Sequence, residues 1–182
     1  MFGEEHPFIA TTLNNLAGLY QNKGEYEKAE SLYNRALEII RNSLGEEHPH
    51  IAVTLNNLAG LYKNLKRYDE ALLYYTEVFN INKRILKPKD PELGLILNNL
   101  GLLLLDMDLF EEAKQMFEKA LEIYTEPTKQ QIIGKKAESI IRLITLNSKQ
   151  AERETNPFNQ MKYLREAFNL CKKIGIFFSN MN

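Results

Sequence analysis

The sequence has one cysteine, three histidines and no tryptophan, and it has no long hydrophobic run. The single cysteine, Cys171, cannot form an internal disulfide, so a fold held together by disulfide bonds is excluded. The longest unbroken apolar stretch, around Leu102 to Leu105, is too short for a membrane-spanning helix. The first five residues are acidic where a signal peptide would be basic and then apolar. We therefore expect a cytoplasmic protein of one domain with no membrane partner.

Motifs for metal binding and catalysis are also missing. His6, His48 and His50 are the only histidines, and no His-Glu-x-x-His or Cys-x-x-Cys spacing accompanies them. There is no Gly-x-Ser-x-Gly motif. The segment Gly134-Lys135-Lys136 lacks the upstream glycine and the Ser or Thr of a phosphate-binding loop. We expect no catalytic residue, no metal site and no cofactor, and hence no enzyme.

The charge is almost balanced overall but unevenly distributed. The formal net charge is −1, yet residues 1–127 carry 13 basic and 20 acidic residues, whereas residues 128–182 carry 10 and 4. A solvated face or a contact between the last helices and the rest of the chain would explain this split, and a basic docking surface is the third interpretation. The aromatic residues of the basic segment fall at helical core spacing, so we expect no nucleic-acid partner.

What the sequence does contain is a repeat of 42 residues. A Gly-Glu-Glu-His-Pro segment and a Leu-Asn-Asn-Leu-Ala-Gly-Leu-Tyr segment each occur twice at this distance. The repeats are residues 2–43, 44–85 and 86–127, of which the first two agree at 21 of 42 positions. A fixed period of this size indicates a stacked array, and such arrays usually bind other proteins.

Each repeat contains two predicted helices. Apolar residues at i, i+3, i+4 and i+7 indicate a helix A from about His6 to Asn22 and a helix B from about Glu25 to Asn42. The intervening Asn-Lys-Gly-Glu is a stop signal followed by a restart. Proline after histidine at the start of a repeat suits a helix N-terminus, where the missing N–H has no partner anyway. Because Asp90 replaces the histidine in the third repeat, we predict a capping role for this position.

Small residues recur where the two helices must approach closely. They are Ala17, Ala59 and Gly101 in helix A and Ala29, Ala71 and Ala113 in helix B, next to the rings Tyr26, Tyr68, Phe110, Tyr33, Tyr75 and Phe117. This alternation of large and small residues is what interlocking helix pairs require. A period of 42 is also six heptads, but prolines at each repeat start and glycines inside the helices argue against a long coiled coil.

The pattern Leu16-Ala17-Gly18-Leu19-Tyr20, followed by Tyr26, Ala29, Tyr33, Ala36 and Leu37, resembles the tetratricopeptide repeat. The 42-residue period and the Gly-Glu-Glu-His-Pro linker are similar to the long-helix subtype found in kinesin light chains. The resemblance covers residues 2–127. It implies an all-α fold, a right-handed α-solenoid of antiparallel helix pairs, in which residues 1–127 form three full repeats. It also implies a protein–protein interaction scaffold.

The match weakens after Pro127. We expect residues 128–182 to be a degenerate fourth repeat that caps the array, because end repeats are usually atypical. Its helices are predicted over about Ile132–Gln150 and from a cap at Asn156-Pro157 to about Phe178. A separate helical hairpin is the alternative. Since the chain begins in mid-motif, it is interpreted either as a fragment of a larger protein or as a family member whose array starts there.

The resemblance further implies a binding groove, because in such arrays helix A lines the concave face and extended peptides lie across it. The matching stripes are Thr11, Asn15, Gly18 and Asn22; Val53, Asn57, Gly60 and Asn64; and Leu95, Asn99, Leu102 and Asp106. Their spacing of four, three and four keeps each stripe on one side of its helix. Gly18 and Gly60 would leave room for the peptide.

Asparagine suits a peptide groove because its carboxamide both donates and accepts hydrogen bonds, as a peptide backbone does. We therefore predict peptide binding by Asn15, Asn57, Asn99, Asn14, Asn56, Asn98, Asn22, Asn64, Gln21 and Lys63. The alternative is that one asparagine of each adjacent pair bonds between repeats and supports the fold. The sequence does not separate these two roles.

Two functions stay open. In the first, the chain is an adaptor that binds a partner peptide in the helix-A groove; with Lys63 as the one nearby cation, acidic peptide C-termini are not the expected ligand. In the second, it is a structural or regulatory arm that packs on its own effector domain or self-associates, with the groove filled intramolecularly. The strip Leu95, Leu102 and Leu105 distinguishes them, since it forms either an apolar pocket or a surface that the next helix covers.

Overall fold

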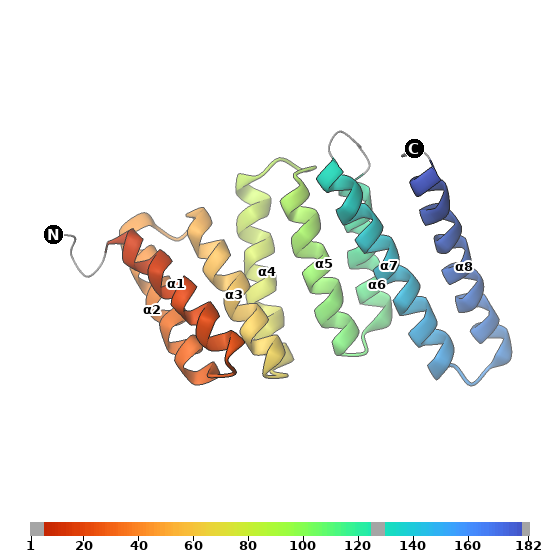
Figure 1. Cartoon of the computed structure of the whole chain (residues 1–182), viewed down its shortest axis with the longest axis horizontal. Coiled ribbons are helices and arrows are strands. Elements are labelled where there is room, and N and C mark those ends of the chain that lie inside the picture. Colours follow the sequence, from red (N-terminus) through yellow and green to blue (C-terminus); the bar gives the residue numbers. More distant parts are fainter. Residues whose placement is uncertain (1–5, 125–129, 180–182) are drawn as a thin grey trace. The chain divides into compact units, whose positions relative to one another are not determined.

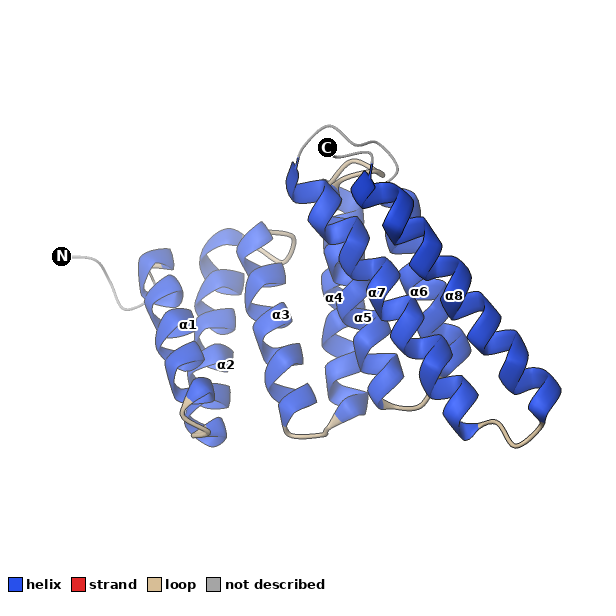
Figure 2. Cartoon of the chain, turned by 45° about the vertical axis from the view of Figure 1, so that its right-hand side comes forward, coloured by secondary structure: helices blue, strands red, loops and turns tan. Residues whose placement is uncertain are grey.

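The computed structural model describes residues 6–124 and 130–179, and in the second range it describes the side chains of residues 138–167, 169 and 170. Over these residues the secondary structure consists of eight helices without a strand (Figure 2). In chain order they are α1 (Pro7–Asn22), α2 (Tyr26–Leu44), α3 (Pro49–Asn64), α4 (Tyr68–Ile85), α5 (Pro91–Asp106), α6 (Phe110–Ile123), α7 (Gln130–Arg153) and α8 (Pro157–Ser179). The predicted all-α class is confirmed. No helix in this part of the chain is long and apolar enough to cross a membrane.

The helices form pairs within two compact units, Met1–Leu86 and Lys87–Asn182. In unit 1, α1 pairs with α2 and α3 with α4, while α2 packs against α3 and α1 also touches α3 (Figure 1). In unit 2, α5 pairs with α6 and α7 with α8, while α6 packs against α7 and α5 touches α7. Each pair is a helix A followed by a helix B, and within each unit the second pair stacks on the first, as in an α-solenoid. The boundary between the units falls at the end of the second repeat, whereas sequence similarity separates residues 1–127 from 128–182.

Each helix A of the three repeats begins at a proline that follows a capping side chain. Nδ1 of His6 and Nδ1 of His48 each accept a hydrogen bond of 3.2 Å from the backbone N–H two residues later. In the third repeat, Oδ1 of Asp90 accepts the equivalent bond at 2.9 Å. Histidine and aspartate serve the same purpose here, because each satisfies an N–H that has no partner inside the helix. The predicted capping role of this position is confirmed.

Each of these helices also ends in the same turn. Gly24, Lys66 and Asp108 have φ angles of 78°, 59° and 62°. Their N–H groups bond to the carbonyl three residues back, and the next N–H bonds to the carbonyl five residues back, at 2.9 Å in all three turns. This is the Schellman motif, whose left-handed position favours glycine. The stop and restart predicted between helices A and B is therefore a defined turn, and two of its three copies use a residue with a side chain.

The small residues lie where helix A meets helix B. Ala17, Ala59, Ala29, Ala71 and Ala113 are completely buried. In the third repeat two glycines permit an even closer approach: an ideal Cβ on Gly101 would lie 2.5 Å from Cε1 of Phe117, and one on Gly94 would lie 2.5 Å from Cζ of Tyr124. Both rings are almost completely buried, so neither can turn away. The predicted alternation of large and small residues is confirmed, and it is tightest in the third repeat.

The helix boundaries differ from the predicted ones by a few residues. The first helix B ends at Leu44 rather than at Asn42. The residue that caps its C-terminus is Gly45, which has a φ angle of 88°. In the last pair, α7 is longer at both ends than the predicted Ile132–Gln150. The predicted cap at Asn156 is confirmed, because its Oδ1 accepts a 2.9 Å hydrogen bond from the N–H of Phe158. The side chains of residues 134–136 and of Cys171 lie outside the described residues.

Candidate functional site

In unit 1 the stripe residues of α1 and α3 lie on two helices that contact each other. We call them the helix-A surface: Thr11, Asn15, Gly18 and Asn22 on α1, and Val53, Asn57, Gly60 and Asn64 on α3. Asn15, Asn22 and Asn64 are exposed, and Asn57 is half-buried. Val53 is 55% exposed. The surface therefore presents amide groups to solvent beside an aliphatic side chain, and all of its residues are uncharged.

A tyrosine hydroxyl lies next to each glycine of this surface. An ideal Cβ on Gly18 would lie 3.6 Å from Oη of Tyr33, and one on Gly60 would lie 3.9 Å from Oη of Tyr75. The Tyr33 hydroxyl donates a 3.1 Å hydrogen bond to Oε1 of Gln21, so this bond ties Gln21 to α2. Burial raises the pKa of Tyr33 and of Tyr75.

The adjacent asparagines take part in bonds between helix pairs. Nδ2 of Asn14 donates to Oγ1 of Thr54 on α3 at 2.7 Å. Asn98 is 1% exposed, and its Oδ1 accepts from the Ser139 hydroxyl on α7 at 2.9 Å. Consecutive residues on a helix point about 100° apart, so Asn14 can face the next pair while Asn15 faces solvent. This arrangement favours the fold-supporting alternative for Asn14 and Asn98; Asn56, the third of this set, is half-buried.

In unit 2 the corresponding stripe is more covered. Leu95, Asn99 and Leu102 are half-buried, Asp106 is exposed, and Leu105 is 6% exposed. The helix α7 runs along α5, which it contacts through the Ser139 bond and through Arg142, whose Nη1 donates to the backbone carbonyl of Asn98 at 3.3 Å. The apolar strip Leu95, Leu102 and Leu105 is thus partly covered and partly open. The side chain of Ile132, at the predicted start of the covering helix, lies outside the described residues.

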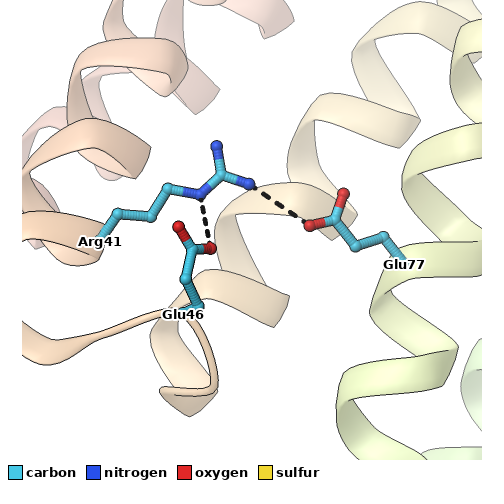
Figure 3. Close-up of polar contacts among 3 residues, drawn as sticks. All are labelled: Arg41, Glu46 and Glu77. Atoms are coloured by element: carbon cyan, nitrogen blue, oxygen red, sulfur yellow. Dashed lines mark hydrogen bonds and ion pairs between the residues drawn. The ribbon is translucent and has the colours of Figure 1, made fainter.

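An arginine forms ion pairs with the linker and with the next helix pair in unit 1. Near the end of α2, Nε of Arg41 bonds to Oε2 of Glu46 in the linker at 3.1 Å, and its Nη2 bonds to Oε1 of Glu77 on α4 at 3.3 Å (Figure 3). Sequence analysis missed this cluster because it is not repeated. The residues 42 positions later are Lys83, Pro88 and Lys119, so the period carries no signal for it.

A second contact between pairs joins a tyrosine to a carboxylate. The Tyr62 hydroxyl on α3 donates to Oε1 of Glu30 on α2 at 2.5 Å, and Nη1 of Arg67 lies 3.8 Å from Oε2 of Glu30. Burial, and then the hydrogen bond to Glu30, raise the pKa of Tyr62. In unit 2, Nζ of Lys114 on α6 lies 3.0 Å from Oε2 of Glu166 on α8. Of these two contacts, the bond between Tyr62 and Glu30 involves α3, which carries part of the helix-A surface.

The chemistry available on the helix-A surface is hydrogen bonding and apolar contact. Its groups are amides, a hydroxyl, the half-buried backbone of two glycines and one aliphatic side chain. Among the described residues, no group of three or more His, Cys, Asp or Glu side chains is arranged to hold a metal ion. The geometry therefore suits recognition of another chain.

The family model of the tetratricopeptide repeat matches residues 8–84 and 51–126, which together make up more than half of the chain. No curated protein matches the sequence. Among solved structures, BtubC (BKLC) from P. vanneervenii is similar with a TM-score of 0.81 and 24% identity, over 97% of this chain and 66% of that one. A putative kinesin light chain from Podosopora anserina with nearly identical TPR-like repeats has a TM-score of 0.60 and 19% identity, over 97% of this chain and 98% of that one. The N-terminal domain of stress-induced protein-1 (STI-1) from C. elegans has a TM-score of 0.54 and 17% identity, over 76% and 98%.

At these identities the solved structures show the fold alone. One of them is named for a putative kinesin light chain, which agrees with the 42-residue period. The chain spans 66% of the length of the BtubC protein. The predicted likeness to tetratricopeptide repeats of the kinesin-light-chain type is confirmed.

Proposed function

The chain belongs to the tetratricopeptide repeat family, and we propose that it binds an extended segment of a partner protein on its helix-A surface. Proteins of this family are generally scaffolds for protein–protein interaction. The proposal adds a site and a mode of recognition to that general role. We propose that this role is non-catalytic. We also propose that the protein is cytoplasmic, as expected from the sequence.

The observation that carries the proposal is the pair of amides at Asn15 and Asn57. They lie on two contacting helices at equivalent positions, one exposed and one half-buried. An extended peptide presents alternating N–H and C=O groups along its edge, and each carboxamide offers one group of each kind in return. Gly18 and Gly60 have no side chain that would hold the peptide away from these amides.

The ten predicted binding residues then divide into three sets. Asn15 and Asn57 contact the peptide backbone, and Asn99 is their counterpart in unit 2. Asn22, Asn64, Gln21 and Lys63 lie towards the C-terminal ends of α1 and α3 and flank the bound segment. Asn14, Asn56 and Asn98 hold neighbouring helix pairs together, because the hydrogen bonds of Asn14 and Asn98 are directed at α3 and α7.

The uncharged character of the helix-A surface also defines its ligand. Binding through amides and through Val53 requires a neutral, extended segment with an aliphatic side chain near the Val53 position. Because screening by salt acts on charges, the affinity should change little with ionic strength. In unit 2, the half-buried Leu95 and Leu102 occupy the positions that correspond to Val53 and Gly60.

The test begins with selection of peptides from a displayed random library on the full chain. The affinity of the selected peptides is then measured by fluorescence polarisation for the wild type and for Asn15→Ala/Asn57→Ala. Loss of hydrogen bonds worth about 0.5–1.5 kcal/mol each should weaken binding by about 5- to 150-fold. The matched control is Asn34→Ala/Asn42→Ala, which removes two exposed asparagines of α2.

Circular dichroism establishes first that both variants are folded. The proposal predicts a loss of affinity in Asn15→Ala/Asn57→Ala and none in the control. Equal affinity of all three proteins would mean that the selected peptides bind elsewhere. Failure to enrich any peptide would contradict peptide binding and favour the structural-arm alternative.

A further inference from the structure

Three helices of unit 2, α6, α7 and α8, line a cleft of about 240 Å³ outside the predicted binding stripes. The middle helix, α7, contacts both of the others (Figure 2). Its residues Leu143 and Asn147 are 3% and 1% exposed, so they form the bottom of the cleft. The residues from α6 and α8 are half-buried or exposed and form its rim: Lys114, Glu118, Glu166, Asn169 and Leu170. We call this site the α6–α8 cleft.

The amide of Asn147, at the bottom of the cleft, has a hydrogen bond on one side only. Its Nδ2 donates to the backbone carbonyl of Leu143, one turn earlier on α7, at 3.0 Å. Its Oδ1 is buried and has no hydrogen-bond donor among the described residues. Buried acceptors in folded proteins almost always have a donor, because leaving one without a partner is costly. Asn147 therefore offers a fixed acceptor to a donor that enters the cleft.

The rim of the cleft carries more negative than positive charge. Nζ of Lys114 on α6 lies 3.0 Å from Oε2 of Glu166 on α8. Burial lowers the pKa of Lys114, but the hydrogen bond to Glu166 and nearby negative charges outweigh this effect, so the pKa is raised. These charges are the carboxylates of Glu166, Glu118 and Glu111. Three carboxylates thus act on one ammonium group, which favours a further cation at the rim.

We propose that the α6–α8 cleft binds the guanidinium group of an arginine side chain from a partner protein. One N–H of the guanidinium donates to Oδ1 of Asn147, and its other N–H groups face the carboxylates of Glu118 and Glu166. Guanidinium suits both because it carries five donors in one plane and is less strongly hydrated than ammonium. The source is a protein, since proteins of this family are generally scaffolds for protein–protein interaction. The cleft lies on other helices than Asn15 and Asn57, so it is a second site.

Lys114 and water are the alternative donors for Oδ1 of Asn147. Turning Nζ of Lys114 towards Asn147 would break its ion pair with Glu166. A water molecule is neutral and would leave the excess negative charge of the rim unchanged. Only a bound guanidinium makes the binding of arginine depend on both Asn147 and the carboxylates, and this dependence is what the experiment measures.

The experiment is an NMR titration of the full chain, labelled with nitrogen-15, with three peptides that differ in one residue. The first is Gly-Gly-Arg-Gly-Gly with blocked ends, and the others have lysine or citrulline in place of arginine. Lysine keeps the charge in a compact ammonium group, and citrulline nearly keeps the shape without the charge. The arginine peptide should shift the side-chain amide signal of Asn147 saturably. Its affinity should exceed that of the citrulline peptide about tenfold and that of the lysine peptide about threefold or more.

Two variants test the two parts of the site. Glu118 is exposed, so Glu118→Gln should fold like the wild type, and it should weaken binding of the arginine peptide about 3- to 10-fold. Asn147→Leu removes the buried acceptor with an apolar side chain of similar size, and it should weaken binding about tenfold or more. Circular dichroism establishes that both are folded.

Glu112→Gln is the matched control for the loss of a carboxylate. Glu112 is exposed on α6 and precedes Glu118 by six residues, which places it on a different side of the helix. Its replacement should leave the affinity within about twofold of the wild type. Asn15→Ala/Asn57→Ala should also bind the arginine peptide like the wild type, so this proposal and peptide binding on the helix-A surface can fail separately.

Three results would overturn the proposal. They are the absence of a shift at Asn147, equal affinity for the three peptides, and arginine binding that neither Glu118→Gln nor Asn147→Leu weakens. Methylguanidinium chloride tests the source of the guanidinium. It should bind about threefold or more weakly than the arginine peptide, because it lacks the alkyl chain that packs beside Leu170 at the rim. Equal affinity would assign the cleft to a free guanidinium compound and contradict a partner's side chain.

Discussion

Replacement of Gly101 by alanine tests the packing of the third repeat most sharply. The first two repeats have alanine at this position, Ala17 and Ala59, and both are completely buried. Comparison of the repeats alone would therefore predict that alanine fits at position 101 and stabilises its helix. The structure predicts instead that Gly101→Ala destabilises the protein, because an alanine Cβ would lie 2.5, 2.8 and 2.9 Å from three ring atoms of Phe117.

The expected size of the effect follows from two opposing contributions. Overpacking of a filled core costs about 1–3 kcal/mol, and the Phe117 ring is 0% exposed, so it has no free space to move into. Alanine in place of glycine inside a helix returns about 1 kcal/mol. We therefore expect Gly101→Ala to lower the free energy of unfolding by about 1 kcal/mol.

Gly18→Ala is the matched control on α1. Its Cβ would lie 3.6 Å from the nearest side-chain atom, the Tyr33 hydroxyl, which is an ordinary contact. Alanine favours the helix more than glycine does, and at this position no steric overlap offsets that gain. The free energy of unfolding of Gly18→Ala should therefore rise by up to about 1 kcal/mol. Urea denaturation followed by circular dichroism measures both variants. A Gly101→Ala protein as stable as the wild type or more stable would refute the packing argument, and a partial rescue by Phe117→Leu would support it.

Three further predictions concern a turn, a buried amide and the response to alkaline pH. Lys66→Gly should raise the free energy of unfolding in urea by about 0.5–1 kcal/mol, because residue 66 has a φ angle of 59°, and a fall would show that the side chain stabilises the turn. Asn98→Ala should lower the same quantity by about 1–2 kcal/mol because the Ser139 hydroxyl loses its buried acceptor, and an unchanged value would contradict the role of Asn98 between helix pairs. Burial raises the pKa of Tyr124 to about 12, so its contribution to stability is complete below the unfolded pKa near 10 and is lost as the pH rises towards 12. Urea titrations from about pH 8 to about pH 11 should therefore show falling stability, with a shallower fall in Tyr124→Phe.

The sequence predicted most of the fold because its signals are local and repeated. The helical spacing of apolar residues, the prolines and the capping side chains each depend on neighbours within a few positions, and the 42-residue period repeats them three times. The caps at His48 and Asp90 were predictable in this way, since different residues with the same hydrogen-bonding ability occupy one position. Helix ends were less predictable because Lys66 and Asp108 adopt a conformation that their residue types do not signal.

The candidate site was less accessible to sequence analysis because it depends on how one helix pair stacks on the next. Asn14 and Asn15 are the same residue type in consecutive positions, and only the direction of their side chains separates a bond to Thr54 from exposure to solvent. The exposure of Leu16 and Leu19 on α1 was missed for a related reason. The residues 42 positions later, Leu58 and Leu61, are identical to them and completely buried, so residue identity does not signal the difference.

The most direct test of peptide binding on the helix-A surface is an NMR titration of the full chain, labelled with nitrogen-15 in its amides, with a peptide selected on it. The account predicts that the side-chain amide signals of Asn15 and Asn57 and the backbone signals of Gly18 and Gly60 shift as the peptide is added. It also predicts that the side-chain signal of Asn98, which is buried against Ser139, stays in place. Shifts confined to α2 or α8, with no change at Asn15 and Asn57, would contradict the account.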